Sequence, residues 1–253
     1  MSDAIVVGSG PNGLACAAVL ARAGMQVTVI EAERTIGGGT RTSELTVPGL
    51  LHDHCSAVHP MAVGSPLFAL LDLAAHGLEW CWPEVDLAHP LDDGSAGVML
   101  RSIEDTAAGL GADGRAWKRL FERPAAGFAE LKDDLVGPVV HVPKHPLRLA
   151  RFGLPAALPA TLVARSFRTP EGRALFGGGA AHTYGPLSRP LSSAVGMALI
   201  SAGHHNGWPV ARGGSRAITD ALAAALLSHG GRIETGHRVT RLSELPAADA
   251  VVL

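Results

Sequence analysis

The chain has 253 residues, of which 47% are hydrophobic and 17% charged, and its formal net charge is -2. This composition can bury a large core, which argues against disorder, and the balanced charge gives no sign of a nucleic-acid surface or an anionic-membrane patch. The widely spaced cysteines form no paired motif, which favours a reducing, cytoplasmic location and argues against disulfides or a zinc site: Cys16, Cys55 and Cys81.

The chain opens with the pattern of a strand, a turn, a helix and a second strand. Residues 4–7 form a short apolar run rich in β-branched side chains, which is typical of a strand buried in a parallel sheet. A helix is predicted over 14–23, with Gly24 as its stop, and a second strand over 26–30. The pattern predicts a Rossmann-like unit with a parallel sheet.

The turn between the first strand and the helix reads Gly8-Ser9-Gly10-Pro11-Asn12-Gly13. Gly8 allows the tight turn, Gly10 lets a pyrophosphate approach the backbone, and Gly13 lets the helix pack closely on the sheet. Glu31, at the end of the second strand, is placed to accept hydrogen bonds from a ribose hydroxyl. We therefore expect the adenosine half of a dinucleotide to bind here.

A second glycine-rich segment follows at once, over residues 34–42. Its three consecutive glycines again permit a close backbone approach, and Arg41 can donate to phosphate or flavin oxygens. Since FAD and NAD share the ADP half, the first motif does not distinguish them; the second favours FAD.

Further along, helices and one hairpin are predicted. A helix begins at Ser65-Pro66 and ends at Gly77; a hairpin pairs 87–91 with 97–101; Ser102 and Asp105 form a capping box. Further helices are predicted over 113–135, interrupted at Pro124, from Thr169, over 192–203 and over 216–229, with loop and short helix over 138–159. The last predicted strands are 232–234, 239–242 and 250–253.

Three other patterns contain residue types that are common in functional sites. His52, His54 and His59 lie near one another in sequence but lack metal-ligand spacing, so we expect no metal. His204-His205 fall in a predicted loop, and Gly177-Gly178-Gly179 follow no strand, which favours helix packing or a turn over phosphate binding. No catalytic acid or base is assigned.

Several longer segments of the sequence resemble a known flavoprotein family. The strings VVGSGPNGLACAAVLARAG, VTVIEAERTIGGGTRTSELTVPG and HDHCSAVHP are similar to the phytoene-desaturase-like and amine-oxidase-like superfamily of FAD-dependent oxidoreductases, in the branch of pyridine nucleotide-disulfide oxidoreductase domain protein 2 and its bacterial relatives. The return segment (GWPVARGGS, then GGRIETGHRVTRL, then ADAVVL) is similar in pattern. Many members carry Arg directly after the second glycine pair, where this chain has Gly39.

The resemblance implies an α/β fold with a Rossmann-like FAD-binding domain and an inserted α+β substrate domain. We expect FAD-binding segments at 1–75 and 213–253, and the substrate domain at 76–212. It also implies that Val239 lies against the adenine and that the histidines around Asp53 line the flavin. The cofactor-binding residues are then Gly8, Gly10, Pro11, Asn12, Gly13, Glu31, Ala32, Gly37, Gly38, Gly39, Thr40, Arg41 and Val239.

The expected function is an FAD-dependent dehydrogenase, desaturase or oxidase that moves a hydride from an organic, apolar small molecule to flavin. An NAD-dependent Rossmann dehydrogenase and a non-enzymatic binding protein on the same fold are the alternatives. Relatives continue well beyond Leu253, so we expect a chain truncated at its C-terminal end, with weak activity and low stability on its own. No membrane-spanning segment is expected, peripheral membrane contact stays open, and so does the oligomeric state.

Overall fold

The computed structural model describes residues 3–138 and 140–253. These residues form two compact units: the first combines the chain up to Cys81 with Val210–Leu253, and the second is Trp82–Pro209. The chain therefore leaves the first unit once and returns to it. The predicted assignment of the units to cofactor and substrate stays a prediction.

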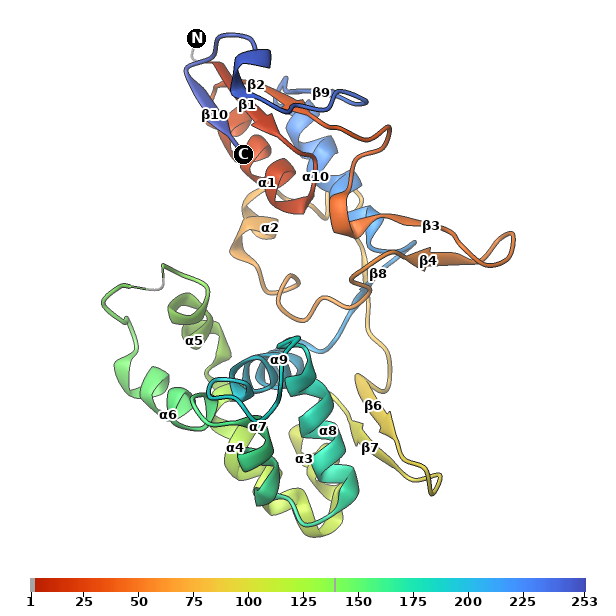
Figure 1. Ribbon diagram of the computed structural model, residues 1–253, viewed down its shortest axis with the longest axis vertical. Helices are drawn as coiled ribbons and strands as arrows, with labels where there is room; N and C mark the ends of the chain where they lie inside the picture. The colour runs from red at the N-terminus through yellow and green to blue at the C-terminus, as the bar shows by residue number, and fades with distance from the viewer. Residues whose placement is uncertain (1–2, 139) are drawn as a thin grey trace. The chain divides into compact units, whose positions relative to one another are not determined.

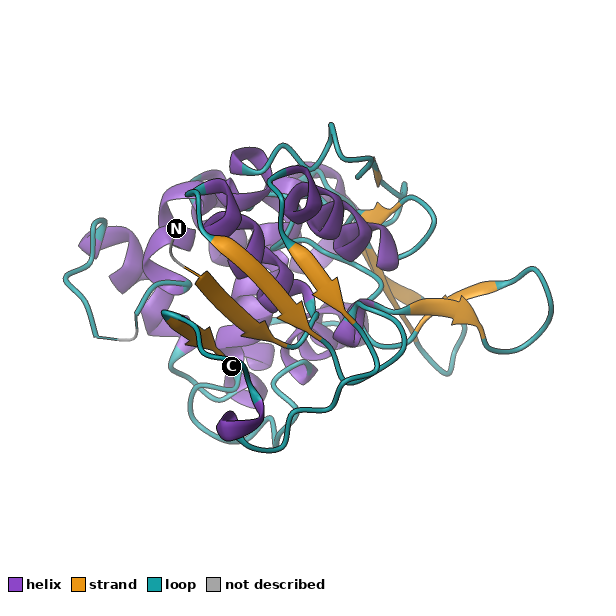
Figure 2. Cartoon of the chain, turned by 90° about the horizontal axis from the view of Figure 1, so that it is seen from above, coloured by secondary structure: helices purple, strands orange, loops and turns teal. Residues whose placement is uncertain are grey.

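A parallel sheet is the centre of the first unit. Its strands are β1 (Asp3–Val7), β2 (Gln26–Ile30), β9 (Arg232–Glu234) and β10 (Ala250–Val252), in the order β10-β1-β2-β9. Every neighbouring pair is parallel, with Val6 opposite both Val29 and Val252. Figure 2 shows the strands pointing the same way, so their carboxyl ends meet at one edge. The predicted α/β class with a Rossmann-like parallel sheet is confirmed.

Two helices pack against this sheet and against each other, α1 (Pro11–Arg22) and α10 (Arg216–Ser228). Their buried residues form one core with the alternate strand residues Val6 and Val29. Because α1 is rich in alanine, its axis can approach α10 and the sheet closely. This packing fixes where the start of α1 lies relative to the end of β1.

Smaller elements complete the first unit (Figure 1). They are a hairpin of β3 (Thr42–Glu44) and β4 (Leu51–Asp53), the one-turn helix η1 (Gly38–Thr40), α2 (Pro66–Leu70), the pair β5 (Trp80–Cys81) and β8 (Val210–Ala211), and η4 (Leu242–Glu244). The sequence did not predict the β3–β4 or β5–β8 pairs, because each strand is too short to show the alternation of apolar and polar residues that is typical of a strand.

The second unit is mostly helical. It contains the hairpin β6 (Leu87–Pro90) and β7 (Ala96–Met99), and the helices α3 (Ile103–Gly109), η2 (Gly111–Asp113), α4 (Gly114–Ala126), α5 (Phe128–Leu135), α6 (Pro146–Ala156), α7 (Ala160–Val163), η3 (Ala164–Ser166), α8 (Pro170–Ala181) and α9 (Ser193–Asn206). Its core is aromatic: Trp117 contacts Phe121, Phe167 and His204 at ring distances between 4.5 and 5.9 Å.

Several predicted elements hold and others need correction. The hairpin, the Ser102 cap and the helix opened by Thr169 are confirmed. The predicted strand at 239–242 is wrong, because that segment is irregular and ends in η4. The predicted helix from Ser65 ends at Leu70 rather than near Gly77.

The helix predicted over 113–135 breaks at Gly127, not at Pro124. Pro124 lies inside α4, near its end, where a missing N–H costs less than in the middle. The stretch predicted as loop and short helix, 138–159, contains the eleven-residue α6. Among the described residues no single helix is long and apolar enough to cross a membrane.

Candidate functional site

The first glycine turn has the tight geometry that its sequence predicts. Gly8 adopts a φ of 100°, a conformation that side chains disfavour, and its N–H donates to the Ile30 carbonyl at 2.8 Å. A Cβ on Gly13 would lie 2.1 Å from the Gly8 carbonyl oxygen. Gly13 is therefore required for α1 to start directly against the end of β1.

The second glycine segment lies directly on the first. A Cβ on Gly38 would lie 2.9 Å from the Gly10 Cα, and Gly38 has a φ of 53°. The Gly37 N–H donates to the Ser9 carbonyl at 3.0 Å. Two loops more than twenty residues apart in the sequence are thus in backbone contact at Gly10 and Gly38, where neither residue carries a side chain.

Glu31 is buried at the end of β2, with 7% of its surface exposed. One carboxylate oxygen accepts the Ser9 N–H at 2.8 Å and the Ser9 hydroxyl at 2.5 Å; the other accepts the Glu33 N–H at 2.9 Å. Burial by itself would raise the pKa of Glu31, but these hydrogen bonds and the Arg41 charge outweigh it and lower the pKa. Glu31 is therefore ionised at neutral pH.

Arg41 and Thr40 hold the second glycine segment in place. The Arg41 guanidinium donates to the Thr35 carbonyl at 2.8 Å and the Gly38 carbonyl at 3.2 Å, and lies 3.7 Å from the Glu31 carboxylate. The Thr40 hydroxyl donates to the Gly37 carbonyl at 2.6 Å. Arg41 therefore links the two halves of the predicted site.

The start of α1 supplies backbone donors. Pro11 occupies the first turn, no side chain caps the helix, and the N–H groups of Asn12 and Gly13 have no partner within it. A cavity of about 290 Å³ lies here, at the carboxyl ends of β1 and β10, lined by Gly8, Gly10, Asn12, Gly13, Cys16 and Val252 among others. In open α/β sheets this edge is where ligands bind.

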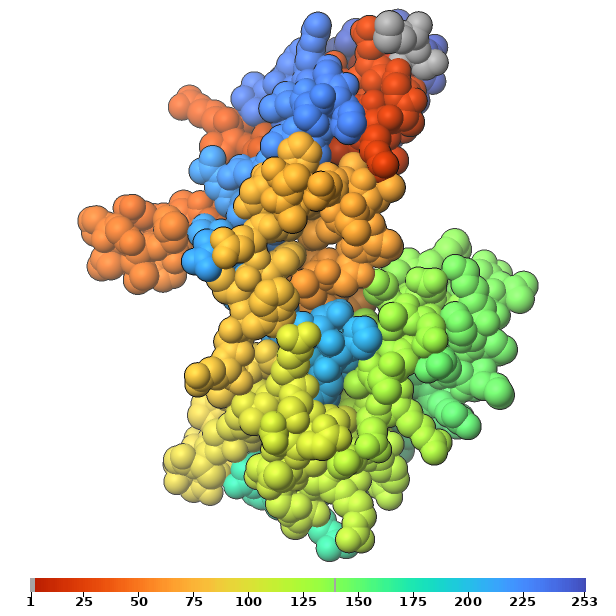
Figure 3. Space-filling model, turned by 180° about the vertical axis from the view of Figure 1, so that it is seen from behind, coloured from red at the N-terminus to blue at the C-terminus, as the bar shows by residue number. Residues whose placement is uncertain are grey.

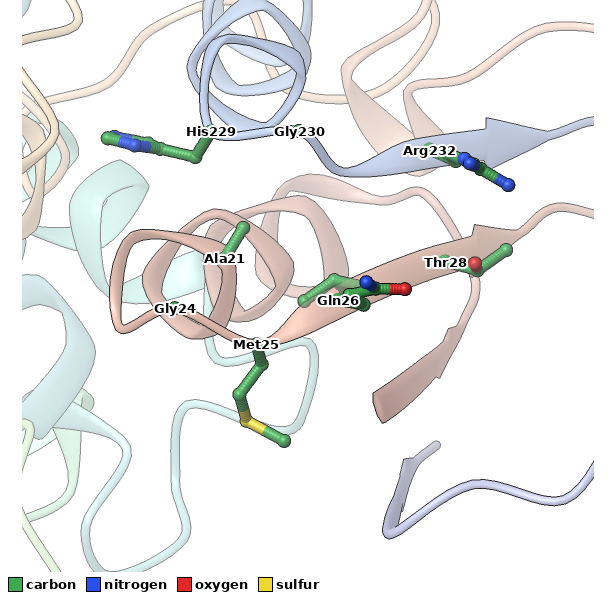
Figure 4. Close-up of a pocket in the computed structure, with 9 residues that line it drawn as sticks. Ala21, Gly24, Met25, Gln26, Thr28, His229, Gly230 and Arg232 are labelled. Atoms are coloured by element: carbon green, nitrogen blue, oxygen red, sulfur yellow. The ribbon is translucent and has the colours of Figure 1, made fainter. Parts of the chain in front are cut away.

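A second cavity, of about 420 Å³, lies at the opposite edge of the sheet (Figure 4). It is formed by Gly24, Gln26 and Thr28 after α1, and by His229 and Arg232 after α10. These residues surround the amino ends of β2 and β9, away from both glycine loops. This cavity is not part of the predicted dinucleotide site.

Ala32 and Val239 are two further residues of the predicted site. Ala32 is half-buried next to Glu31 in the chain. Val239 is half-buried and irregular, just beyond a segment in which the Gly236 and His237 N–H groups donate to the Glu33 and Glu31 carbonyls. The return segment thus runs along the end of β2, although not as the predicted strand.

The three predicted histidines do not converge. His52 pairs with the Thr46 hydroxyl, His54 with the Ser43 hydroxyl, and His59 with the Ser215 hydroxyl at 2.8 Å. Nowhere in the described part of the chain do three His, Cys, Asp or Glu side chains gather to hold a metal ion.

The other patterns are structural. His204 and His205 lie in the last turn of α9, not in a loop, and His204 is buried against Trp117. Gly178 lies inside α8, where a Cβ would lie 1.8 Å from His89. The glycine run therefore serves helix packing.

Sequence reasoning gave no role to two side chains that shape the site. Ser9 bridges Glu31 and the second glycine loop. Thr219, on α10, lies 3.4 Å from the Thr40 hydroxyl. The signal for Ser9 was a hydroxyl between two motif glycines; Thr219 had none, because its role depends on how α10 packs.

Comparisons with known proteins agree with this geometry. Residues 6–73 match the family described as NAD(P)-binding Rossmann-like domain. The chain is 30% identical to hydroxyneurosporene desaturase of Cereibacter sphaeroides over 94% of this chain and 50% of that protein. It is 36% identical to pyridine nucleotide-disulfide oxidoreductase domain-containing protein 2 of Rattus norvegicus over 30% of this chain and 13% of that protein.

Among solved structures, cyclohexylamine oxidase from Brevibacterium oxydans matches with a TM-score of 0.52 and 19% identity, over 92% of this chain and 51% of that one, which indicates a shared fold. The chain thus spans about half the length of the desaturase and of the oxidase. Together with the two interlocked glycine motifs, these matches show a Rossmann-like dinucleotide-binding domain in a chain that is similar to phytoene-desaturase-like FAD-dependent oxidoreductases.

Proposed function

We propose that this chain binds FAD and forms part of an oxidoreductase that moves a hydride from an apolar organic substrate to the flavin. The observation that carries the proposal is the contact between the two glycine loops. A single glycine loop at the start of a helix is compatible with any dinucleotide. A second glycine loop in contact with the first suits a longer ligand that continues along the same edge of the sheet.

The residues present fit such a ligand. Gly38 leaves bare backbone where a Cβ would meet Gly10, and the first N–H groups of α1 offer phosphate the positive end of the helix dipole. We assign the pyrophosphate to Gly8–Gly13, the ribose to Glu31 and Ala32, and the remaining contacts to Gly37–Arg41, with Val239 beside the adenine.

When bound, FAD would supply the hydride-accepting ring, and the protein's part is to bind, orient and exclude water. The Glu31 carboxylate repels a 2′-phosphate, which disfavours NADP. We infer that the second unit carries substrate. The apolar character of that substrate is supported by the similarity to a protein named for hydroxyneurosporene, and cytoplasmic location stays a prediction.

Purification and direct titration test cofactor choice. We expect the protein to retain a chromophore near ~450 nm and to bind FAD more tightly than NAD. Tighter NAD binding without flavin uptake would favour a nicotinamide-dependent dehydrogenase. Retained FAD that no apolar substrate reduces under anaerobic conditions would favour a non-enzymatic binding protein.

A pair of glycine variants tests the interlocked loops. Gly38→Ala should lower FAD affinity by about tenfold or more, because its Cβ meets Gly10 and its φ is positive. Gly49→Ala is the matched control: it also has a positive φ, of 83°, but nothing lies within 4 Å of its Cβ. Equal FAD affinity in both variants would contradict the assignment.

A further inference from the structure

His59 is a buried histidine in the segment that follows β4. Only 9% of its surface is exposed. By contrast, His54 is exposed at the end of the β3–β4 hairpin, which projects from the first unit (Figure 3). The centroid of the Trp80 ring lies 5.9 Å from that of the His59 ring, and the two planes meet at 52°. A polar ring enclosed in this way costs free energy unless its nitrogens have hydrogen-bond partners.

One ring nitrogen of His59 has a partner, and the proton between them can be assigned. His59 Nε2 lies 2.8 Å from the Ser215 hydroxyl. That hydroxyl has a single proton, which it donates to the Ser56 carbonyl at 2.5 Å, because a carbonyl has no proton to donate. The proton between His59 and Ser215 therefore belongs to Nε2, and the Ser215 oxygen accepts it.

The other ring nitrogen, Nδ1, is left with a free lone pair. Burial lowers the pKa of His59 and outweighs the nearby Asp53 charge, so the ring is neutral at neutral pH and holds one proton. Since that proton is on Nε2, Nδ1 can only accept a hydrogen bond. Across residues 3–138 and 140–253, no group donates to it. The donor that it lacks is one that a ligand can supply.

Helix α10 relates His59 to the second glycine segment. Ser215, the partner of His59, directly precedes α10. Thr219, four residues further along, lies 3.4 Å from the Thr40 hydroxyl of that glycine segment. Residues four apart lie on one face of a helix, and one turn rises about 5.4 Å. His59 and the second glycine segment therefore contact the same face of α10, about one turn apart.

The backbone donors at the start of α10 are already in use. The Ser215 N–H donates to the Asp53 carboxylate at 2.7 Å, and the Arg216 N–H donates to the Thr42 hydroxyl at 3.0 Å. These bonds fix Ser215 and, through it, the orientation of the His59 ring. A ligand in this place would therefore find an oriented acceptor, the His59 Nδ1, rather than free N–H groups.

We propose that His59 holds the flavin half of FAD, with its Nδ1 lone pair accepting a hydrogen bond from that half. This inference rests on the proposed function. The ADP half is assigned to the first glycine loop and Glu31, so the flavin half extends past the second glycine segment, beside which His59 lies. The flavin half carries N–H and hydroxyl donors, on its ring and on its ribityl chain. Of the three histidines that the family resemblance places near the flavin, the geometry thus selects one and names the atom.

Two substitutions separate the roles of Nδ1 and Nε2. The amide of Gln ends at the ε position, so His59→Gln can keep an N–H toward Ser215 but has no acceptor in place of Nδ1. The amide oxygen of Asn is at the δ position, so His59→Asn keeps an acceptor there and loses the N–H toward Ser215. We expect His59→Gln to lower FAD affinity about fivefold or more, with His59→Asn closer to the natural chain. A purely structural role for His59 predicts the reverse order.

Fluorescence titration with FAD and calorimetry with ADP measure the effect. Because ADP ends before His59, both variants should bind ADP like the natural chain, which also shows that they are folded. FAD methylated at its ring N–H identifies the donor. A loss of affinity for this analogue as large as that caused by His59→Gln assigns the ring, and an unchanged affinity assigns a ribityl hydroxyl.

Matched controls are His229→Gln and His229→Asn, which change an exposed histidine at the opposite edge of the sheet and should bind both ligands like the natural chain. FAD affinity unaffected by His59→Gln, or an equal loss of FAD and ADP affinity in that variant, would overturn this inference and leave the proposed cofactor intact. Absence of FAD binding to the natural chain would overturn the proposed function, and this inference with it.

Discussion

Glu31 has two tasks in the proposed site. Its carboxylate accepts hydrogen bonds from Ser9 and Glu33, which shapes the first glycine loop, and the oxygen that accepts from Glu33 keeps a lone pair for a ligand. Removing it would therefore change the free protein as well as the complex. A test of ribose contact has to separate these two effects.

We expect Glu31→Ala to weaken FAD binding by about 1–3 kcal/mol, the range of a hydrogen bond to a charged acceptor and of a buried donor left unsatisfied. Titration with ADP and with 2′-deoxy-ADP separates the two effects. If Glu31 contacts the ribose, the natural chain prefers ADP and the variant loses that preference. Glu33→Ala, which removes a neighbouring exposed carboxylate, should keep the preference; an unchanged preference in Glu31→Ala would contradict the ribose contact.

At the scale of elements, buried carboxylates fix the second unit. Asp113, the last residue of η2 and the one before α4, accepts the Arg168 N–H at 2.7 Å, and the Thr169 N–H and hydroxyl at 2.8 and 2.7 Å. Burial would raise the pKa of Asp113, but these hydrogen bonds outweigh it and lower the pKa. The contact joins the start of α4 to the start of α8.

We expect Asp113→Ala to lower the free energy of unfolding of the second unit by about 2–4 kcal/mol, because two part-buried backbone donors and one hydroxyl lose a buried, charged acceptor. Urea denaturation followed by tryptophan fluorescence measures it, since Trp117 is buried in this unit. Asp92→Ala, at an exposed hairpin residue, should cost less than about 0.5 kcal/mol. A similar cost in both variants would mean that the Asp113 contacts contribute little.

At the scale of the whole molecule, each unit encloses a neutral histidine. Burial lowers the pKa of His59 in the first unit and of His204 in the second. His204 is neutral for a second reason: the Trp117 ring N–H donates to its Nε2 at 2.9 Å, which a proton there would prevent. The folded chain thus binds fewer protons than the unfolded chain at mildly acidic pH.

We expect the stability from these histidines to be fully present above about pH 6.5, their unfolded pKa, and to be lost as pH falls toward their lower folded values. Each group contributes a slope of up to about 1.4 kcal/mol per pH unit. His204→Gln should flatten this slope between about pH 5 and 6.5, whereas the exposed His229→Gln should not. A slope unaffected by His204→Gln would assign the pH dependence to other groups.

The sequence by itself determined the elements whose signal is local. Gly8, Gly10 and Gly13 follow a run of β-branched residues and precede an alanine-rich helix. The first strand, the turn and the helix can therefore be predicted from residues that are adjacent in the sequence. The same holds for the Ser102 and Thr169 caps, because a cap involves residues only three apart.

Only the tertiary structure decided contacts between distant segments. Both glycine motifs can be found in the sequence. The sequence does not reveal that Gly38 contacts Gly10, that Thr219 lies beside Thr40, or that 239–242 forms no strand. Likewise, the leucines of α6 have the same pattern whether they face core or solvent. Burial depends on which surfaces meet, and that is set by the packing of the whole chain rather than by any local period.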